Sequence, residues 1–548
     1  MKNLYILLSM ATAFLLASCY DDKGGNDFDT PLPKVTITIP QGSYSGQLGD
    51  VISIMPTVKS EIGENDLSYY WEICGDIANS HGNSDFTSLL ADEDQSRDLN
   101  YICHTDSNLT KINTAYKCRL RASQKSTGRN FYSNTFKITL VGVVGMMILH
   151  GNDNECNIGI LQASDVMPKG FSAPDSPKSA AEIYSQNNGG EKIPGKGSYL
   201  YQPYGSYNSI AAETFPHHHI VVHTDKGVSL AGYADFSYYG DWSTLFMLKG
   251  SDALNANQPK GSFSYSNYIF GFDGDAMFLC EVYGNYPFLQ PELTSSTVCT
   301  DGNTYILDPV LCASTKNNSI CYANTINGDP SHNGFVKFTS PSIGNMYKRI
   351  TLLNVTGKNF NPADMKAELI KMDRMGNGHI IAALKGKSDN REYAGKYFLA
   401  DLYADASATS DIPAYLHDMS SCPGINDAQF WAFGNTINMC YYATKNTIYH
   451  YGIDGATLYA PTPLDMVDGS TLNITGQITM MKRLLCNNIS FSDGNMMAVA
   501  TWDGTNSTLW ILHMDTASGR VNSYSKYNKD TVEGWNYEKI VDIYPKKM

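Results

Sequence analysis

The stretch NMMAVATWDGTNSTLWILHM, residues 495–514, contains the pattern that decides the fold class. Two apolar segments flank Asp503-Gly504, and an Asp-Gly dipeptide supplies the positive φ that tight hairpin turns need. Similar Asp-Gly or Asn-Gly turns recur at residues 273–274, 301–302, 377–378, 454–455 and 493–494. We therefore expect the chain from residue 142 to 548 to consist of short antiparallel strands.

The composition favours an all-β protein with more than one domain. The chain has 36 Tyr, 21 Phe and 46 Gly, while charged residues make up only 17%. Aromatic residues are enriched in strands and glycine in turns. A length of 548 residues exceeds what one hydrophobic core usually serves. The net charge of −14 argues against nucleic acid, which requires a basic surface.

A long series of hairpins has to hide its strand edges, and closure into a β-propeller is one way to do so. At about 40 to 60 residues per blade, residues 142–548 predict a propeller of about seven blades. Two stacked sandwiches are the alternative. A short helix is expected over residues 176–184, where Ser176 is a candidate N-cap and Pro177 the first helical residue.

Residues 31–141 predict a small sandwich of immunoglobulin type. Six or seven strands are expected there, with Trp71 in the third. Glu72 shares that strand, and we expect it to be a solvated charge on the exposed sheet face. The strands are expected at residues 35–39, 51–56, 67–73, 116–122 and 131–140.

The first nineteen residues predict a lipoprotein signal peptide. Lys2 begins a basic region, and the apolar run over residues 4–17 is too short to span a bilayer. Small residues precede Cys19, which forms a lipobox and predicts lipid attachment at Cys19. An ordinary secretory signal with a chance cysteine is the alternative. Residues 20–30 predict a flexible acidic tether.

Several short motifs give the chain a family resemblance. The segment LSYYWEICGD, residues 67–76, resembles the Tyr-x-Trp…Gly-Asp core of the polycystic-kidney-disease (PKD) domain. With the segments at 146–149, 220–227 and 534–544, nearly the whole chain resembles the PKD-like lipoproteins of gut Bacteroidetes. The resemblance implies a PKD-like domain followed by a propeller-like region. It also implies nutrient capture near an outer-membrane importer of the starch-utilisation type, and it supplies no catalytic residues.

The acidic tether resembles the signal that sends such lipoproteins to the cell surface. We therefore expect an outer-membrane, lipid-anchored protein that is exposed on the cell surface. A plain linker facing the periplasm is the alternative.

The cysteines predict neither a zinc knuckle nor a redox motif, because no C-x-x-C occurs among the 12 cysteines. Strand alternation places Cys74 and Cys118 on opposite sheet faces, which suits unpaired thiols. Cys312 and Cys321 could bridge a hairpin, or stay unpaired.

His217 and His219 are the candidate metal ligands. On a strand they would project to the same side about 6 to 7 Å apart, and this H-x-H spacing can chelate zinc. Partly exposed, hydrogen-bonding histidines at a strand entrance are the alternative. The sequence identifies no third ligand and predicts no cofactor apart from this possible divalent metal.

Aromatic residues near glycine turns are candidate ligand contacts. Exposed tyrosine and tryptophan side chains can stack on sugar faces or anchor a partner protein. Packing between blades is the alternative for most of them. The candidates are Tyr201, Tyr204, Tyr238, Tyr239 and Trp242.

Together these features predict a non-enzymatic binding or accessory module for glycan or peptide capture beside an outer-membrane importer. Its membrane contact is the lipid on Cys19, and no catalytic residue is assigned. The alternative is a polysaccharide-active propeller hydrolase or lyase, assisted by a metal at His217 and His219.

Overall fold

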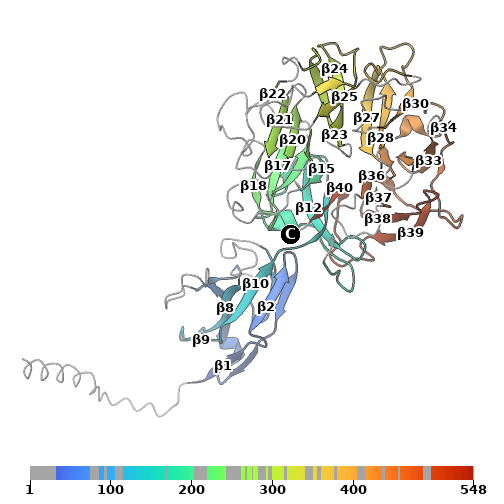
Figure 1. Cartoon of the computed structure of the whole chain (residues 1–548). Coiled ribbons are helices and arrows are strands. Elements are labelled where there is room, and N and C mark those ends of the chain that lie inside the picture. The colour runs from blue at the N-terminus through green and yellow to red at the C-terminus, as the bar shows by residue number, and fades with distance from the viewer. Residues whose placement is uncertain are drawn as a thin grey trace, which may run out of the picture. The chain divides into compact units, whose positions relative to one another are not determined.

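The computed structural model describes most of the chain from residue 33 onward. The described residues are 33–74, 86–91, 95–104, 115–167, 171–202, 219–241, 261–265, 268–273, 276–281, 292–293, 299–313, 318–339, 350–353, 360–375, 379–403, 414–434, 438–454, 457–484 and 495–546. Nearly all regular structure among them is antiparallel β-sheet, which confirms the all-β prediction (Figure 1).

The chain divides into two compact units. The first comprises residues 1–43, 53–100 and 117–137, and the second comprises residues 44–52, 101–116 and 138–548.

The first ten strands form three small sheets. Their orders are β1-β4, β3-β7 and β2-β10-β8-β5-β6, and β9 also pairs with β8. A 3₁₀ turn, η1, covers Glu64–Asp66. The expected strand at 131–140 is two strands, because the chain leaves the sheet at residues 133–135. The strands are β1 (Val35–Thr38), β2 (Ser43–Gln47), β3 (Val51–Ile54), β4 (Thr57–Ser60), β5 (Leu67–Cys74), β6 (Phe86–Ser88), β7 (Leu99–Ile102), β8 (Ala115–Gln124), β9 (Asn130–Tyr132) and β10 (Phe136–Val141).

Strand alternation builds the core of the first unit. Along β8, buried residues alternate with partly exposed ones, as expected for a strand with one covered face. Trp71 on β5 is fully buried and packs edge-on against Phe136 at a ring distance of 6.0 Å. Its indole N–H donates to the carbonyl of Ser96 at 3.0 Å. The polar atom of this large side chain is thus satisfied inside the core.

Seven further sheets are described in the second unit. Six have four or five strands in chain order: β15 to β18, β19 to β22, β23 to β26, β27 to β30, β31 to β34 with β35 on β33, and β36 to β39. The seventh has the order β13-β12-β11-β40, and β14 also pairs with β12. Figure 1 shows these sheets in colours from green-blue to red.

The strands of these sheets are β11 (Gly145–Gly151), β12 (Glu155–Gln162), β13 (Lys178–Ala180), β14 (Ile193–Pro194), β15 (Gly197–Tyr201), β16 (His219–Thr224), β17 (Gly227–Gly232), β18 (Tyr238–Asp241), β19 (Gly261–Tyr265), β20 (Tyr268–Asp273), β21 (Ala276–Glu281), β22 (Glu292–Leu293), β23 (Tyr305–Ala313), β24 (Asn318–Ile326), β25 (Gly334–Thr339), β26 (Ile350–Leu352), β27 (Ala367–Arg374), β28 (His379–Gly386), β29 (Tyr397–Tyr403), β30 (Ala414–Asp418), β31 (Phe430–Phe433), β32 (Met439–Ala443), β33 (Ile448–Asp454), β34 (Thr457–Leu458), β35 (Thr462–Pro463), β36 (Gln477–Leu484), β37 (Met496–Trp502), β38 (Ser507–Met514), β39 (Val521–Tyr527) and β40 (Lys539–Lys546).

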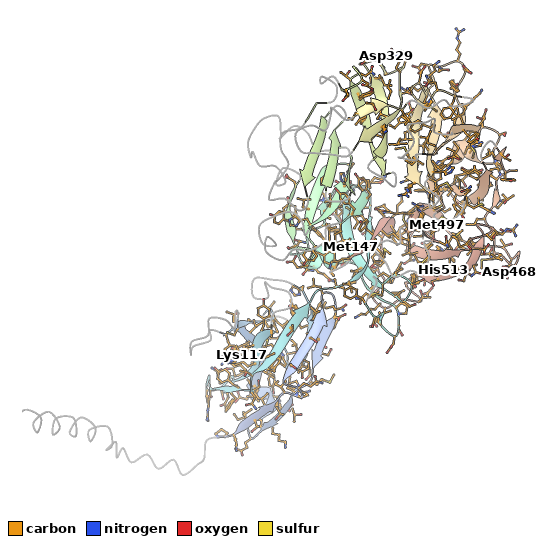
Figure 2. The ribbon with its side chains drawn as sticks, in the orientation of Figure 1. Lys117, Met147, Asp329, Asp468, Met497 and His513 are labelled. Atoms are coloured by element: carbon orange, nitrogen blue, oxygen red, sulfur yellow. The ribbon has the colours of Figure 1, made fainter. Side chains whose placement is uncertain are left out.

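The strand β40 joins the end of the second unit to its beginning. It pairs antiparallel with β11, and Ile543 lies opposite Ile148. β11 lies between β12 and β40 and every one of its residues is buried, including the apolar run Met146–Leu149. Met147 on β11 and Met497 on β37 are both buried side chains of this unit (Figure 2).

The first strands of neighbouring sheets also contact one another. β15 and β36 each contact β40, β36 contacts β31, β31 contacts β27, β27 contacts β23, and β23 contacts β19. Polar side chains link several of these strands. Asp542 on β40 accepts from Lys482 Nζ at 2.8 Å and from the backbone N–H of Leu200 at 3.0 Å. Arg483 on β36 pairs with Asp373 on β27 at 3.4 Å.

The helix predicted over residues 176–184 overlaps the observed one only at its end. Residues 178–180 form β13, because they pair with β12 and because the N–H of Ser179 donates to the carbonyl of Glu533. The four-residue helix α2 (Ile183–Gln186) begins within the last two residues of the predicted range. A 3₁₀ turn, η7, covers Ile425–Asp427. Among the described residues, none of the helices has the length and apolar character needed to cross a membrane.

Among the cysteines whose side chains the structure describes, none forms a disulfide bond. Cys74 and Cys118 are both buried, and the strand register places them on opposite sheet faces, as predicted. Cys321 forms no bridge with Cys312.

Candidate functional site

The sheet of β15 to β18 carries the predicted site residues that the structure describes. Tyr201 ends β15, His219 begins β16, and Tyr238 and Tyr239 begin β18. Tyr204, His217 and Trp242 lie outside the described residues, as does Cys19.

A β-bulge exposes two consecutive tyrosines on β18. Leu230 lies opposite Gly240 and Ala231 lies opposite Tyr238, so Tyr239 is the extra residue of the strand. A bulge redirects side chains, and bulges are frequent beside functional sites. As a result Tyr238 is 56% exposed and Tyr239 is 48% exposed, although strand neighbours normally face opposite sides.

Both tyrosines are held in place by neighbouring groups. The ring of Tyr239 stacks on the buried ring of His219 at a centroid distance of 3.8 Å and an interplanar angle of 28°. The backbone N–H of Tyr238 donates to Asn188 Oδ1 at 2.6 Å, and Asn188 Nδ2 donates to the carbonyl of Phe236. Partial burial and the nearby Asp241 raise the pKa of Tyr238, which keeps its phenol neutral at physiological pH. The Tyr239 ring and the Tyr238 backbone are thus held by neighbouring groups, while both side chains are exposed.

Tyr201 belongs to a different, buried row of rings. His223 stacks on Tyr199 at 4.3 Å, and Tyr201 lies 6.4 Å from His223. Tyr201 is only 6% exposed. Burial lowers the pKa of His223 to about 3, so its imidazole is neutral and packs as an aromatic ring. This row contributes packing on the same sheet as the exposed pair.

The described residues bring together no metal centre. No group of three or more His, Cys, Asp or Glu side chains among them is placed to hold an ion. His219 stacks on Tyr239, and its predicted partner His217 lies outside the described residues.

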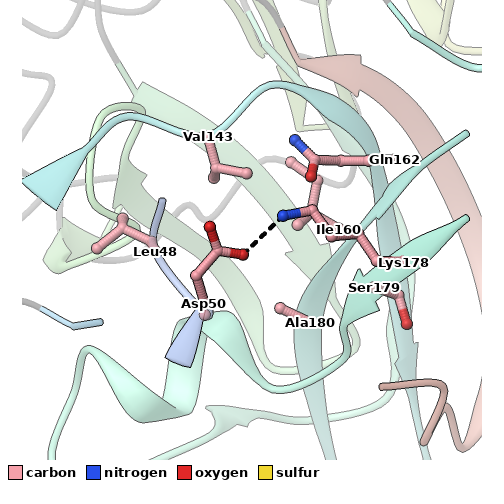
Figure 3. A pocket seen from close by; sticks show the side chains of 9 residues that line it. Leu48, Asp50, Val143, Ile160, Gln162, Lys178, Ser179 and Ala180 are labelled. Atoms are coloured by element: carbon pink, nitrogen blue, oxygen red, sulfur yellow. Dashed lines mark hydrogen bonds and ion pairs between the residues drawn. The ribbon is translucent and has the colours of Figure 1, made fainter. Parts of the chain in front are cut away.

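A shallow pocket lies within the second unit (Figure 3). It is lined by Leu48, Asp50, Val143, Ile160, Gln162, Lys178, Ser179 and Ala180 among others, and its volume of about 230 Å³ includes its open mouth. Lys178 Nζ pairs with Asp50 at 2.8 Å across it. Ligand sites usually measure about 300 to 1,000 Å³, so this pocket is small for an organic ligand.

A charged cluster that the sequence did not predict lies on the outward face of the first unit. Glu72 on β5 is not a solvated charge: its side chain is 11% exposed and accepts from Arg119 Nε at 2.6 Å and from Arg121 Nε at 2.5 Å. The alternation of Lys117, Arg119 and Arg121 along β8 was the available signal. The sequence did not show that Glu72 pairs with these arginines, because Glu72 lies on another strand.

Comparison with known proteins identifies the class of the N-terminal part. Residues 19–196 match the PKD-like family model, so the chain carries a PKD-like family domain over this range. The match extends beyond β10 and through β14. No curated protein matches the chain.

The solved structures that match include one of low similarity. It is the crystal structure of the N-terminal eight Ig domains of Down Syndrome Cell Adhesion Molecule (DSCAM) isoform 1.30.30. The identity is 8% and the TM-score 0.14, and the match covers 90% of this chain. It covers 54% of that chain, so this protein spans about half the length of the structure it matches.

Proposed function

We propose that this chain is a lipid-anchored protein of the outer-membrane surface that binds a glycan or a peptide beside a nutrient importer. It acts as a non-enzymatic accessory module. The observation that carries the proposal is the pair of exposed tyrosines, Tyr238 and Tyr239, on the bulged strand β18. Exposed, rigid aromatic side chains lose little conformational entropy on binding and can stack on sugar rings or anchor a peptide.

We also infer that the sheets of the second unit are the blades of a β-propeller of about seven blades. Three observations support this: strands that follow chain order within the sheets, contacts between successive first strands, and the pairing of β40 with β11. In such an arrangement β40 completes the first blade, which removes an exposed sheet edge. A propeller presents its ligand on a preformed, rigid surface.

The proposed lipid anchor would raise the local concentration of this surface beside an importer. Tethering makes the second binding event intramolecular, so even a ligand that binds weakly would be retained near the membrane. The PKD-like domain would then act as a spacer between the anchor and the binding unit.

A glycan and peptide array tests the binding proposal. Detergent-solubilised protein is applied with and without a chelator, and the wells are analysed for released products. Reproducible binding that chelation leaves unchanged supports the proposal. Product release in the same wells would instead establish the polysaccharide-cleaving alternative.

The double substitution Tyr238→Ala with Tyr239→Ala should weaken binding of the array ligand about tenfold or more, because both aromatic contacts are removed. Isothermal titration calorimetry measures the effect. The matched control is Tyr459→Ala. It removes a tyrosine with 55% exposure directly after β34, and it should leave the affinity within twofold of wild type. Equal losses in the two variants would contradict a site on β18.

Replacement of the proposed lipid-bearing residue, Cys19→Ser, should release the protein from the membrane fraction. Each buried acyl methylene stabilises attachment by about 0.8 kcal/mol, so loss of the acyl chains abolishes stable anchoring. Mass spectrometry of the wild-type N-terminal peptide should find acyl groups on Cys19. Protease treatment of intact cells, with a periplasmic protein as the protected control, tests surface exposure. An unmodified Cys19 would refute the anchor.

A further inference from the structure

The outward face of strands β6, β5, β8 and β9 carries two arginines in a fixed arrangement. We call it the arginine face, and its central residues are Tyr70, Glu72, Phe86, Arg119, Arg121 and Tyr132. The guanidinium of Arg119 lies over the Phe86 ring at 3.9 Å and over the Tyr132 ring at 4.2 Å. That of Arg121 lies over the Tyr70 ring at 4.2 Å. Stacking and the shared carboxylate hold both groups in place.

The geometry leaves donors of both arginines available. Each Nε atom donates to Glu72, one to each carboxylate oxygen. Arg121 Nη1 also donates to Asn130 Oδ1 at 3.3 Å. Among the described residues, no acceptor contacts the Nη atoms of Arg119 or Arg121 Nη2. The two side chains are 26% and 25% exposed, so these donors are within reach of a ligand.

The charge of the face opposes that of the protein. Lys117 continues the row of cations along β8 (Figure 2), so this row has three positive side chains, and Glu72 is the carboxylate that pairs with two of them. The whole chain has a net charge of −14. A local excess of cations on an acidic protein favours an anionic partner at this face, because complementary charge both attracts and orients a ligand.

We propose that the arginine face binds a polysaccharide that bears carboxylate groups. A planar guanidinium presents its donors in a fork that matches a carboxylate. Arg119, Arg121 and Lys117 follow at every second position of one strand, which spaces them about 6.6 Å apart. This row suits a polymer with repeated charges. Tyr132 lies beside this row of cations and is 48% exposed, so its ring can stack on the apolar face of a sugar ring. An acidic polypeptide has no sugar ring to make this contact.

The test uses the full-length chain in detergent micelles and fluorescently labelled polygalacturonate. Saturable binding that weakens as salt is raised is expected, because the interaction is carried by charge. Dextran, which is neutral, should not bind. Poly-glutamate supplies the same carboxylates without sugar rings and should bind at least about tenfold more weakly. Equal affinity for poly-glutamate would overturn the polysaccharide assignment, and no binding of polygalacturonate would overturn the site.

Variants separate this face from general charge attraction. Arg121→Lys keeps a positive charge for Glu72 but loses the planar fork, so affinity for polygalacturonate should fall about tenfold. The control Lys59→Gln removes one exposed charge from β4, outside the face, and should change affinity less than twofold. A loss in Lys59→Gln equal to that in Arg121→Lys would refute the proposal.

Two further variants keep the test valid if Arg121→Lys lowers the stability of the first unit. Lys117→Gln and Tyr132→Ala change side chains that make no hydrogen bond to Glu72, and each should weaken binding severalfold. Unchanged affinity in both would contradict the proposal. Tyr238→Ala should leave polygalacturonate binding intact, so failure here and failure of the proposed function are distinguishable.

Discussion

The substitution Ile543→Asp should abolish the cooperative fold of the second unit. Ile543 is fully buried in β40, lies opposite Ile148 on β11, and belongs to a core that includes Trp535 and Met480. A carboxylate at this position would have no partner, and buried unpaired charges are among the most destabilising changes known. We expect a loss of about 4 kcal/mol or more. Thermal unfolding followed by circular dichroism and limited proteolysis measure it.

The control for this experiment is the same change at an exposed site. Ile370 in β27 is 37% exposed, and Ile370→Asp should change the free energy of unfolding by about 0.5 kcal/mol or less. If both variants lower the free energy of unfolding by the same amount, β40 does not hold the second unit together. The first unit should keep its own unfolding transition in both variants.

The substitution Lys546→Met should stabilise the second unit. Lys546 is fully buried, its Nζ donates to the carbonyl of Val143 at 2.6 Å, and it lies over the ring of Phe236 at 5.4 Å. Burial lowers the pKa of Lys546 to about 7. Methionine fills a similar volume without the desolvation cost. We expect a gain of about 2 kcal/mol at pH 6.5, since the lost hydrogen bond offsets part of the benefit.

The pH dependence identifies the cause of this gain. Because the pKa of Lys546 is lower in the folded chain than in the unfolded chain, protonation favours unfolding. The penalty is full below pH 7 and is relieved as the pH rises toward 10.5. The advantage of Lys546→Met in urea unfolding should therefore shrink between pH 6.5 and pH 9.5. A difference that stays constant with pH would exclude this explanation. Lys445→Met, at an exposed position, is the control and should have little effect at either pH.

Local structure could be predicted from sequence where the signal was local. The hairpin over residues 495–514 forms as β37 and β38, with Trp502 opposite Ser507. Asp503 Oδ1 accepts from the N–H groups of Thr505 and Asn506, which fixes the turn. All the information for this turn lies within a few residues, so composition and pattern were sufficient.

The errors concern segments whose structure depends on distant partners. Residues 178–180 have helix signals, yet they pair with β12 and with the carbonyl of Glu533, which lie far away in sequence. The prediction that Glu72 is solvated is wrong, because alternation shows which face a residue occupies but not what covers it. Its arginine partners are 47 and 49 residues away. The candidate tyrosines show the same limit: Tyr238 and Tyr239 are both exposed only because of a bulge that the sequence did not reveal.

The pairing of β11 with β40 has a consequence for the order of synthesis. β11 is made early in the second unit, and its partner β40 is made after every other strand of that unit. Until then an apolar strand has an open hydrogen-bonding edge, which is a site for aggregation during slow, non-local folding. The native state of the second unit can therefore be reached only after translation has passed β40.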